Sequence, residues 1–265
     1  MVTNNPYVPQ RALIQKVIRH TKKEHTFRLA FEGEVKPGQF FEVSLPKYGE
    51  APISVSAAGP DYIELTIRNT GRVTEGVFAC QEGDHLGIRG PYGNGFDPEQ
   101  FKGKDLLIVS GGTGAAPVHG LIDYFAVHPD QRKSLTILSS FKREDEILFL
   151  EDYERWSETS NVMVTLTRET KPTKWLSGRP TNYISDLRFD DIREVTAIIV
   201  GPEMLMKNTA AALIEQGMKE ENIWVSQERK MCCGLGKCGH CRIGEHYICL
   251  DGPVFNYTES LKLID

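Results

Sequence analysis

Five cysteines lie in one short segment near the end of the chain, residues 232–254, which we call the cluster loop. Four of them have a spacing that could hold a metal centre, namely Cys233, Cys238, Cys241 and Cys249. Their spacing is Cys-x4-Cys-x2-Cys with the fourth cysteine eight positions further on, and this opening is typical of plant-type [2Fe-2S] sites. Between them stand Gly234, Gly236 and Gly239, which are small enough to let backbone N–H groups turn toward cluster sulfurs. The segment therefore predicts a [2Fe-2S] cluster, a group that transfers electrons one at a time.

Zinc is the main alternative, because a Cys-x2-Cys pair also occurs in zinc sites. Such sites usually combine two separated pairs, or one pair with two histidines, whereas here three cysteines lie within nine residues. Cys232 and Cys233 are adjacent and cannot both face one iron, and only Cys233 gives the four-residue gap. His240 is not expected as a ligand because four thiolates already suffice. The isolated Cys80 is expected to be a small core residue.

The composition is that of an ordinary soluble protein, with 265 residues, of which 40% are hydrophobic and 25% charged. This length suggests about two domains plus an appendage. The net charge of −5 gives no reason to expect nucleic acid as a partner, and no apolar run approaches the roughly 18–20 residues of a membrane span. The chain starts without the charged-then-apolar pattern of a secretory leader, so a cytoplasmic protein with reduced thiols is expected.

The cluster segment, residues 227–265, needs a scaffold, and residues 1–100 predict an antiparallel β-barrel. Three stretches in this part alternate apolar and polar residues, and turn residues separate them. They are Thr26–Phe31, Gln39–Leu45 and Tyr62–Arg68. One short helix is expected over Val73–Ala79, capped by Thr70 or Thr74.

Residues 101–226 change to a pattern of alternating strands and helices, which predicts a doubly wound parallel sheet. The strand Lys104–Ser110 is apolar over most of its length and runs into a glycine-rich turn, after which a helix is expected over Val118–Val127. Strand, glycine turn and helix together can place a pyrophosphate on a helix N-terminus, although a tight turn without a ligand has the same local sequence. Further strands are expected at Ser134–Ser140, Asn161–Arg168, Ala197–Val200 and, last, Ile223–Ser226, and further helices at Glu144–Trp156 and Met204–Gly217.

Four motifs together resemble the ferredoxin–NAD(P) reductase superfamily. In chain order they are Pro52-x-Ser54, Gly71-x-x-Thr74, Gly111-Gly112-Thr113-Gly114-x-Ala116-Pro117 and Gly201-Pro202-x-Met204. With the C-terminal cysteines added, the chain resembles the electron-transfer subunits of dihydroorotate dehydrogenase, of sulfhydrogenase (gamma subunit) and of anaerobic sulfite reductase. The sulfite reductase type is favoured, because Ala51 stands where the dihydroorotate type usually has Arg, and because the cysteines lie in a compact loop.

The resemblance implies that FAD binds on the barrel and that a nicotinamide dinucleotide binds on the sheet. For FAD it implies Pro52, Ile53 and Ser54 along the isoalloxazine, Ile67 and Arg68 beside the flavin or ribityl, and Gly71, Val73 and Thr74 at the pyrophosphate. For the dinucleotide it implies Gly111, Gly112, Thr113, Gly114 and Pro117, with Gly201 and Pro202 near the nicotinamide half. Ala51 lacks the charge that the family's Arg offers to flavin phosphate, and Arg68 or Arg89 is the expected substitute.

The resemblance also implies a function in electron transfer. NADH, favoured over NADPH, would reduce bound FAD, and electrons would leave through the cluster to a partner catalytic subunit. The cofactors supply this chemistry, so no side chain is predicted as a catalytic acid or base.

The favoured partner is a sirohaem-containing sulfite reductase subunit, which a ferredoxin-like subunit could join. A dihydroorotate dehydrogenase or sulfhydrogenase partner is the alternative. Two other classes stay open, namely a stand-alone NAD(P)H oxidoreductase with a structural zinc and a non-enzymatic redox-sensing subunit.

Overall fold

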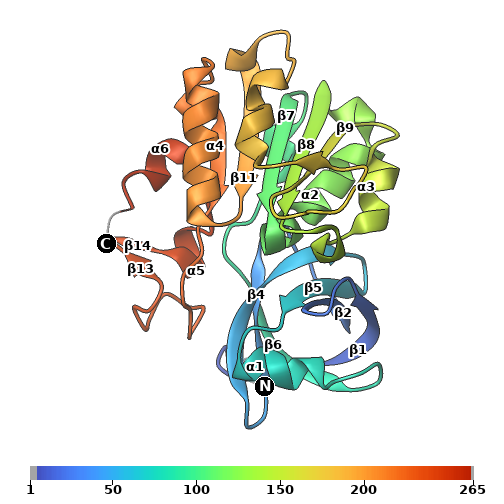
Figure 1. Cartoon of the computed structure of the whole chain (residues 1–265). Helices are drawn as coiled ribbons and strands as arrows, with labels where there is room; N and C mark the ends of the chain where they lie inside the picture. Colours follow the sequence, from blue (N-terminus) through green and yellow to red (C-terminus); the bar gives the residue numbers. More distant parts are fainter. Residues whose placement is uncertain (1–4, 264–265) are drawn as a thin grey trace.

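The barrel forms one lobe of the molecule and the parallel sheet the other (Figure 1). The computed structural model describes residues 5–263. The first lobe is a closed antiparallel barrel in the strand order β1-β2-β5-β4-β3-β6, which confirms the fold predicted for the N-terminal part. Its strands are β1 (Gln10–Arg19), β2 (Glu24–Ala30), β3 (Phe40–Leu45), β4 (Gly49–Ala58), β5 (Tyr62–Arg68) and β6 (His85–Tyr92).

Two of these strands, β1 and β6, were not predicted, although they close the barrel by pairing with each other. The sequence of β6 contains Gly90 and Pro91, which by themselves indicate a turn. In β1 only Ala12 and Ile14 are fully buried, so its alternation is weak. Tertiary pairing, rather than local pattern, therefore fixes these two strands.

The short helix of the barrel, α1, spans Arg72–Phe78 and begins one residue earlier than expected. Its N-cap residue is Gly71, so the predicted caps Thr70 and Thr74 are wrong. Thr74 is the third residue of the helix, and its hydroxyl oxygen accepts hydrogen bonds from the backbone N–H groups of Thr70 and Gly71, each at 3.0 Å. The side chain thus closes the first turn from inside the helix.

The second lobe is a seven-stranded sheet in the order β10-β9-β8-β7-β11-β12-β15, in which only β15 runs antiparallel to its neighbour. The strands are β7 (Asp105–Gly111), β8 (Ser134–Phe141), β9 (Asn161–Leu166), β10 (Leu176–Ser177), β11 (Val195–Val200), β12 (Ile223–Ser226) and β15 (Val254–Asn256). Helices α2 (Ala115–Val127) and α3 (Leu150–Trp156) cover one face, and α4 (Glu203–Glu215) covers the other. This confirms the doubly wound arrangement.

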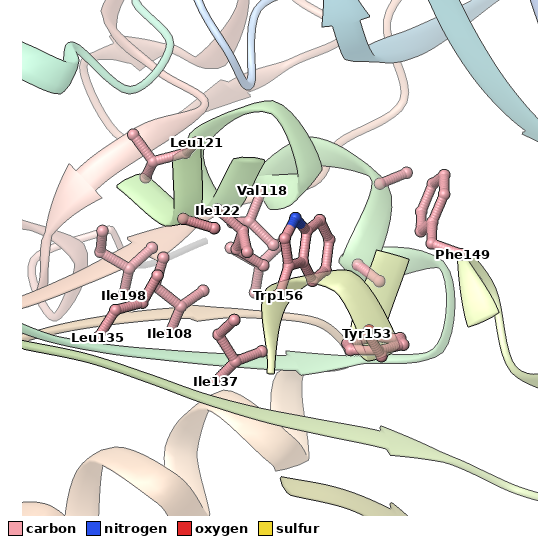
Figure 2. Close-up of a cluster of buried hydrophobic side chains, with 14 of the residues drawn as sticks. Ile108, Val118, Leu121, Ile122, Leu135, Ile137, Phe149, Tyr153, Trp156 and Ile198 are labelled. Carbon is pink, nitrogen blue, oxygen red and sulfur yellow. The ribbon is translucent and has the colours of Figure 1, made fainter. Parts of the chain in front are cut away.

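Alternate residues of β7 face opposite sides of the sheet, as in any strand buried on both faces. Leu106 and Ile108 belong to the core beneath α2 and α3, whereas Leu107 and Val109 belong to the core beneath α4. Figure 2 shows side chains of the first core, among them Ile108, Ile137, Ile198, Val118, Ile122 and Trp156. The uninterrupted apolar run of this strand is thereby explained.

The helix predicted over Glu144–Trp156 is wrong for its first half. A short turn spans Glu144–Glu146, and α3 begins only at Leu150. Between them, residues 147–149 are all buried, and three consecutive side chains cannot share one face of a helix. The chain therefore leaves helical geometry to bury them, and Phe149 takes a left-handed conformation with φ of 56°.

The C-terminal segment is packed onto the sheet. Its elements are β13 (Arg242–Ile243), β14 (His246–Tyr247), α5 (Ile248–Asp251), β15 and α6 (Tyr257–Ser260). The expectation that Ile223–Ser226 is the last strand is wrong, because β15 pairs with it at the edge of the sheet. No helix within residues 5–263 has the length and apolar character needed to cross a membrane.

Candidate functional site

A pocket of about 290 Å³ lies where the carboxyl ends of the parallel strands meet the barrel. The sheet contributes Gly111 at the end of β7, Gly112 and Thr113 after it, and Pro202 after β11, and the barrel contributes Arg68 from β5. Ligands of open α/β sheets bind at this edge. The structure thus brings together, in one pocket, residues predicted for the flavin and residues predicted for the dinucleotide.

The glycines around this pocket have two different functions. A Cβ on Gly114 would lie 2.5 Å from the Val200 carbonyl oxygen, and one on Gly201 would lie 3.1 Å from the backbone nitrogen of Gly111. These glycines let the ends of β7 and β11 touch. Gly112 instead has φ of +55°, and a Cβ added to it would meet no atom within 4 Å, so a ligand phosphate could approach its backbone closely at the start of α2.

Two of the predicted binding residues have buried side chains. Ile67 is 1% exposed and belongs to the barrel core, and Pro117 is buried in the first turn of α2. Their side chains pack the core, and only their backbone atoms can contribute to a ligand site. Proline in a first helical turn also fixes the direction in which the helix begins.

The remaining residues predicted for the flavin lie on β4 and at the start of α1. Pro52, Ile53 and Ser54 are half-buried on β4. Helix α1 packs on the start of β4, where a Cβ on Gly49 would lie 3.4 Å from the Val73 side chain. At the N-cap position, a Cβ on Gly71 would meet no atom within 4 Å. This open approach is what the predicted pyrophosphate position needs.

Helix α2 is anchored on β4 by His119. Its Nδ1 atom lies 3.2 Å from the Ser56 carbonyl oxygen, and its Nε2 atom lies 2.8 Å from the Asp152 carboxylate. A Cβ on Gly120 would lie 3.1 Å from the same carbonyl oxygen. Because Ser54 is two residues away on that strand, these contacts fix its position relative to the glycine-rich turn at the start of α2.

The four predicted cluster cysteines fall into two pairs. Burial and a hydrogen bond with the Cys241 thiol raise the pKa of Cys249 to about 12. Backbone N–H groups of His240 and Cys233 lower the pKa of Cys238, which also hydrogen-bonds with the Cys233 thiol. Two thiolates for each of two irons is how four cysteines hold a [2Fe-2S] cluster. Within residues 5–263, no three or more His, Cys, Asp or Glu side chains converge around a single ion position.

Backbone N–H groups point at the cysteine sulfurs. Leu235 donates to the sulfur of Cys233 at 3.3 Å, and Gly236 donates to the sulfur of Cys249 at 3.2 Å. Gly234, Gly236 and Gly239 have φ values of 69°, 66° and 81°, which only glycine adopts easily. The donor set and its amide partners therefore fit an iron–sulfur cluster, whose potential depends on such hydrogen bonds.

A ladder of neighbouring residues connects the predicted flavin strand to the cluster loop. Phe40 of β3 pairs with Ser54 of β4 on one side and with Tyr92 of β6 on the other. The Tyr92 ring lies against Gly234, where a Cβ would come within 2.6 Å of it. Neighbouring strands lie about 4.8 Å apart, so β4 and β6 are separated by roughly 10 Å. The loop itself shares a core with Phe40 through the buried Cys241 and Cys249.

Two residues that hold the cluster loop on the barrel, Arg89 and Asn94, were not predicted in that role. Arg89 donates from Nη1 to the Cys233 carbonyl oxygen at 2.9 Å and from Nη2 to that of Cys232 at 3.2 Å. Its Nε and Nη2 atoms also bind both oxygens of Glu50 at 2.8 and 2.7 Å. With these bonds and one to the Tyr92 hydroxyl, the guanidinium has no donor left for flavin phosphate. The expectation that Arg89 replaces the missing Arg at position 51 is wrong.

Asn94 holds the other end of the loop. Its side-chain NH₂ donates to the carbonyl oxygens of Val254 at 2.7 Å and Asp251 at 3.0 Å, and its side-chain oxygen accepts from the backbone N–H of Val254 at 3.1 Å. In Figure 1 the C-terminal segment lies alongside the barrel below α4. The stretch Gly90–Gly95, whose sequence indicates only a turn, thus includes a residue that holds the cluster loop on the barrel.

Glu42 of β3 is buried between the barrel and the cluster loop. Phe41 points into the barrel core, so Glu42 and Phe40 face outward, where Phe40 packs in the same core as Cys241. Glu42 is 0% exposed, and neither of its carboxylate oxygens has a hydrogen-bond partner among the described residues. Burial, with a further contribution from the charge of Glu50, raises the pKa of Glu42 to about 7.

This carboxyl predicts a pH-dependent gain from the substitution Glu42→Gln. Folding raises the pKa of this carboxyl, so the folded state favours its protonated form. Stability is therefore lost as the pH rises from about 4.5 to about 7. We expect Glu42→Gln to unfold at a temperature several degrees higher at pH 8, equivalent to about 3 kcal/mol, and at an unchanged temperature near pH 4.5. The exposed Glu32→Gln controls for lost charge. Equal effects at both pH values would contradict burial of an unpaired carboxylate.

Comparison with known proteins places the chain in a family. The model for the iron–sulfur cluster binding domain of dihydroorotate dehydrogenase B matches residues 228–260, and that for the oxidoreductase NAD-binding domain matches residues 108–211. Sulfhydrogenase 1 subunit gamma of Pyrococcus furiosus is 36% identical, covering 99% of this chain and 95% of the relative. A probable dihydroorotate dehydrogenase B (NAD(+)) electron transfer subunit of the same organism is 33% identical over 96% of the chain and 92% of the relative. The chain belongs to this family of electron-transfer subunits.

Solved structures agree on the fold of this family member. A chain of the NADH-dependent reduced ferredoxin-NADP oxidoreductase superposes with a TM-score of 0.77 at 24% identity, covering 96% of this chain and 92% of that one. A ferredoxin NADP+ reductase from Neisseria gonorrhoeae, solved with bound FAD and NADP, superposes with a TM-score of 0.68 at 22% identity over 78% of this chain and 91% of that one. Barrel and sheet together are therefore the ferredoxin reductase fold.

The family confirms the cofactor prediction and changes the partner prediction. An iron–sulfur domain, an NAD-binding domain and the FAD-binding ferredoxin reductase fold support FAD, an iron–sulfur cluster and NADH. The preference for a sulfite reductase type finds no support among these relatives, which are sulfhydrogenase and dihydroorotate dehydrogenase subunits. The preference rested on Ala51 and a compact loop, two local features that do not distinguish one electron-transfer subunit from another.

Proposed function

We propose that this protein oxidises NADH and delivers electrons through FAD and a [2Fe-2S] cluster to the catalytic subunit of a sulfhydrogenase-type complex. Two sulfhydrogenase gamma subunits of Pyrococcus furiosus, 36% and 34% identical, cover 99% and 97% of the chain, which supports this partner.

The observation that carries the proposal is the ladder from Ser54 through Phe40 and Tyr92 to Gly234. The predicted flavin strand β4 and the strand β6, against which the cluster loop lies, flank β3 in the same barrel. When bound, FAD converts the hydride of NADH into single electrons and the cluster passes these on. The chain's own contribution is positional, because it holds the two predicted sites on strands that lie roughly two strand spacings, about 10 Å, apart.

In this proposal, backbone groups and one positively charged side chain bind the nucleotides. Gly112 offers open backbone at the start of α2, and Arg68 presents a guanidinium from the barrel into the same pocket while paired with Glu24 at 3.2 Å. A guanidinium can serve two phosphate oxygens at once. Arg68 is therefore the substitute that we propose for the Arg missing at position 51.

A second candidate partner is a dihydroorotate dehydrogenase subunit. It is favoured by the match of residues 228–260 to the cluster domain of that enzyme. The nucleotide and cluster sites would work in the same way, and only the protein that receives or supplies the electrons would differ.

Isolation of the native complex distinguishes these partners. The chain would be tagged at its chromosomal locus and the complex purified anaerobically. We expect NADH-dependent hydrogen evolution or sulfur reduction from the complex. NAD+ reduction driven by dihydroorotate would establish the second candidate, and NADH-dependent sulfite reduction would overturn both.

A further inference from the structure

One charged side chain lies between the barrel and the cluster loop. The Arg89 side chain is 5% exposed, although burial of a guanidinium is costly unless it is paired and fully hydrogen-bonded. Its partner Glu50 is 27% exposed and is the only acid among the described residues that hydrogen-bonds to it. The ion pair therefore joins β4 and β6 next to the backbone of Cys232 and Cys233, whose carbonyl oxygens Arg89 binds.

The two ends of the cluster loop are held by chemically different groups. Asn94 holds the distal end at Asp251 and Val254 with a neutral amide. Arg89 holds the proximal end with a cation. A neutral donor would suffice for docking alone, as Asn94 shows. A buried charge near a ligand residue has a second effect, because electrostatic interactions are stronger in a low-dielectric interior.

We propose that Arg89 is a positioning residue that fixes the cluster loop on the barrel and, through its charge, makes the cluster easier to reduce. The inference rests on the proposed function, because it requires a cluster at the four cysteines. With a cluster bound, reduction would add one electron and one negative charge to it, with reduced flavin as the donor, and no bond would form or break. Arg89 attracts that charge and Glu50 opposes it, so the two residues shift the potential in opposite directions.

The test is a set of variants studied as the whole chain loaded with FAD and cluster. Arg89→Met removes the cation, Glu50→Gln leaves the cation uncompensated, and Arg89→Lys keeps a cation without the planar fork. Asn94→Ala is the matched control, because it loosens the loop without changing any charge. The readouts are iron and acid-labile sulfide content and the midpoint potential from a dye-mediated titration followed by electron paramagnetic resonance.

We expect the reduction equilibrium of Arg89→Met to fall at least about tenfold, which is a potential lower by about 59 mV for one electron. Glu50→Gln should raise the potential, Arg89→Lys should stay close to the unsubstituted protein, and Asn94→Ala should lower the unfolding temperature without moving the potential. If Arg89→Met does not retain a cluster, the midpoint potential of Glu50→Gln becomes the test: a rise supports the proposal, and an unchanged potential overturns it.

The failures are distinguishable. Absence of any cluster from the unsubstituted protein would overturn the proposed function itself. A cluster with the same potential in Arg89→Met and Glu50→Gln would overturn only the inference about Arg89. Equal shifts in Arg89→Met and Asn94→Ala would also overturn it, because loosening of the loop would then explain the change.

Discussion

Cys233→Ser should be purified without an iron–sulfur cluster, whereas Cys232→Ser should retain one. The sulfur of Cys233 accepts the N–H of Leu235 and pairs with Cys238, as a cluster ligand would. The Cys232 residue is exposed, and its carbonyl oxygen, which Arg89 binds, is unchanged by the substitution. We expect about two irons and two sulfides per chain in Cys232→Ser and almost none in Cys233→Ser, measured by chemical analysis and visible absorption.

The adjacent cysteines make this a closely matched pair, since both substitutions replace one thiol with a hydroxyl in the same loop. Cys80→Ser, in the barrel, adds a control for loss of any thiol. Equal loss of iron in Cys232→Ser and Cys233→Ser would contradict the assignment of Cys233. About one zinc per chain and no iron in the unsubstituted protein would instead support the zinc alternative.

Gly112→Ala should raise the KM for NADH by at least about tenfold, a loss of about 1.4 kcal/mol of binding. The substitution places a Cβ in the open space at the start of α2 and strains a backbone with φ of +55°. Backbone strain in this region costs roughly 1–2 kcal/mol, so the expected loss of affinity must be separated from a loss of stability. The measurement is the NADH dependence of flavin bleaching in an anaerobic stopped-flow experiment.

The substitution Gly103→Ala separates a loss of NADH affinity from a loss of stability. Gly103 has φ of +68° and, like Gly112, no atom within 4 Å of a Cβ position, but it lies before β7 at the opposite end of the strand. We expect both variants to lose similar stability in thermal unfolding and only Gly112→Ala to lose NADH affinity. An unchanged KM in Gly112→Ala, or the same increase in both variants, would show that the dinucleotide does not use this turn.

The local sequence pattern was sufficient to predict those strands and helices whose apolar residues recur with one simple period. The strand Tyr62–Arg68 was predicted with its observed bounds, and β7 and α2 flank the glycine-rich turn as expected. The cysteine spacing likewise anticipates a loop in which the sulfurs pair and receive backbone N–H groups. In each case the deciding signal is a short pattern in the sequence itself.

Features fixed by distant contacts could not be predicted in this way. Arg89 and Asn94 meet the cluster loop across separations of 144 and 160 residues, and nothing near them in sequence indicates this. Strand β15 depends on pairing with β12, and the break before α3 depends on the burial of residues 147–149. The preference among partner subunits finds no support among the relatives for a related reason, because a partner is recognised by a surface that no short motif describes.

The most direct test of the central proposal is an anaerobic titration of the purified chain with NADH, followed by visible absorption and electron paramagnetic resonance. We expect the yellow flavin band and the broad reddish absorption of the cluster to bleach together, and the signal of a reduced [2Fe-2S] cluster to appear. A non-enzymatic redox-sensing protein would bind nucleotide without bleaching. Bleaching of flavin alone, in protein whose iron and sulfide content is complete, would contradict electron transfer from the barrel to the cluster loop.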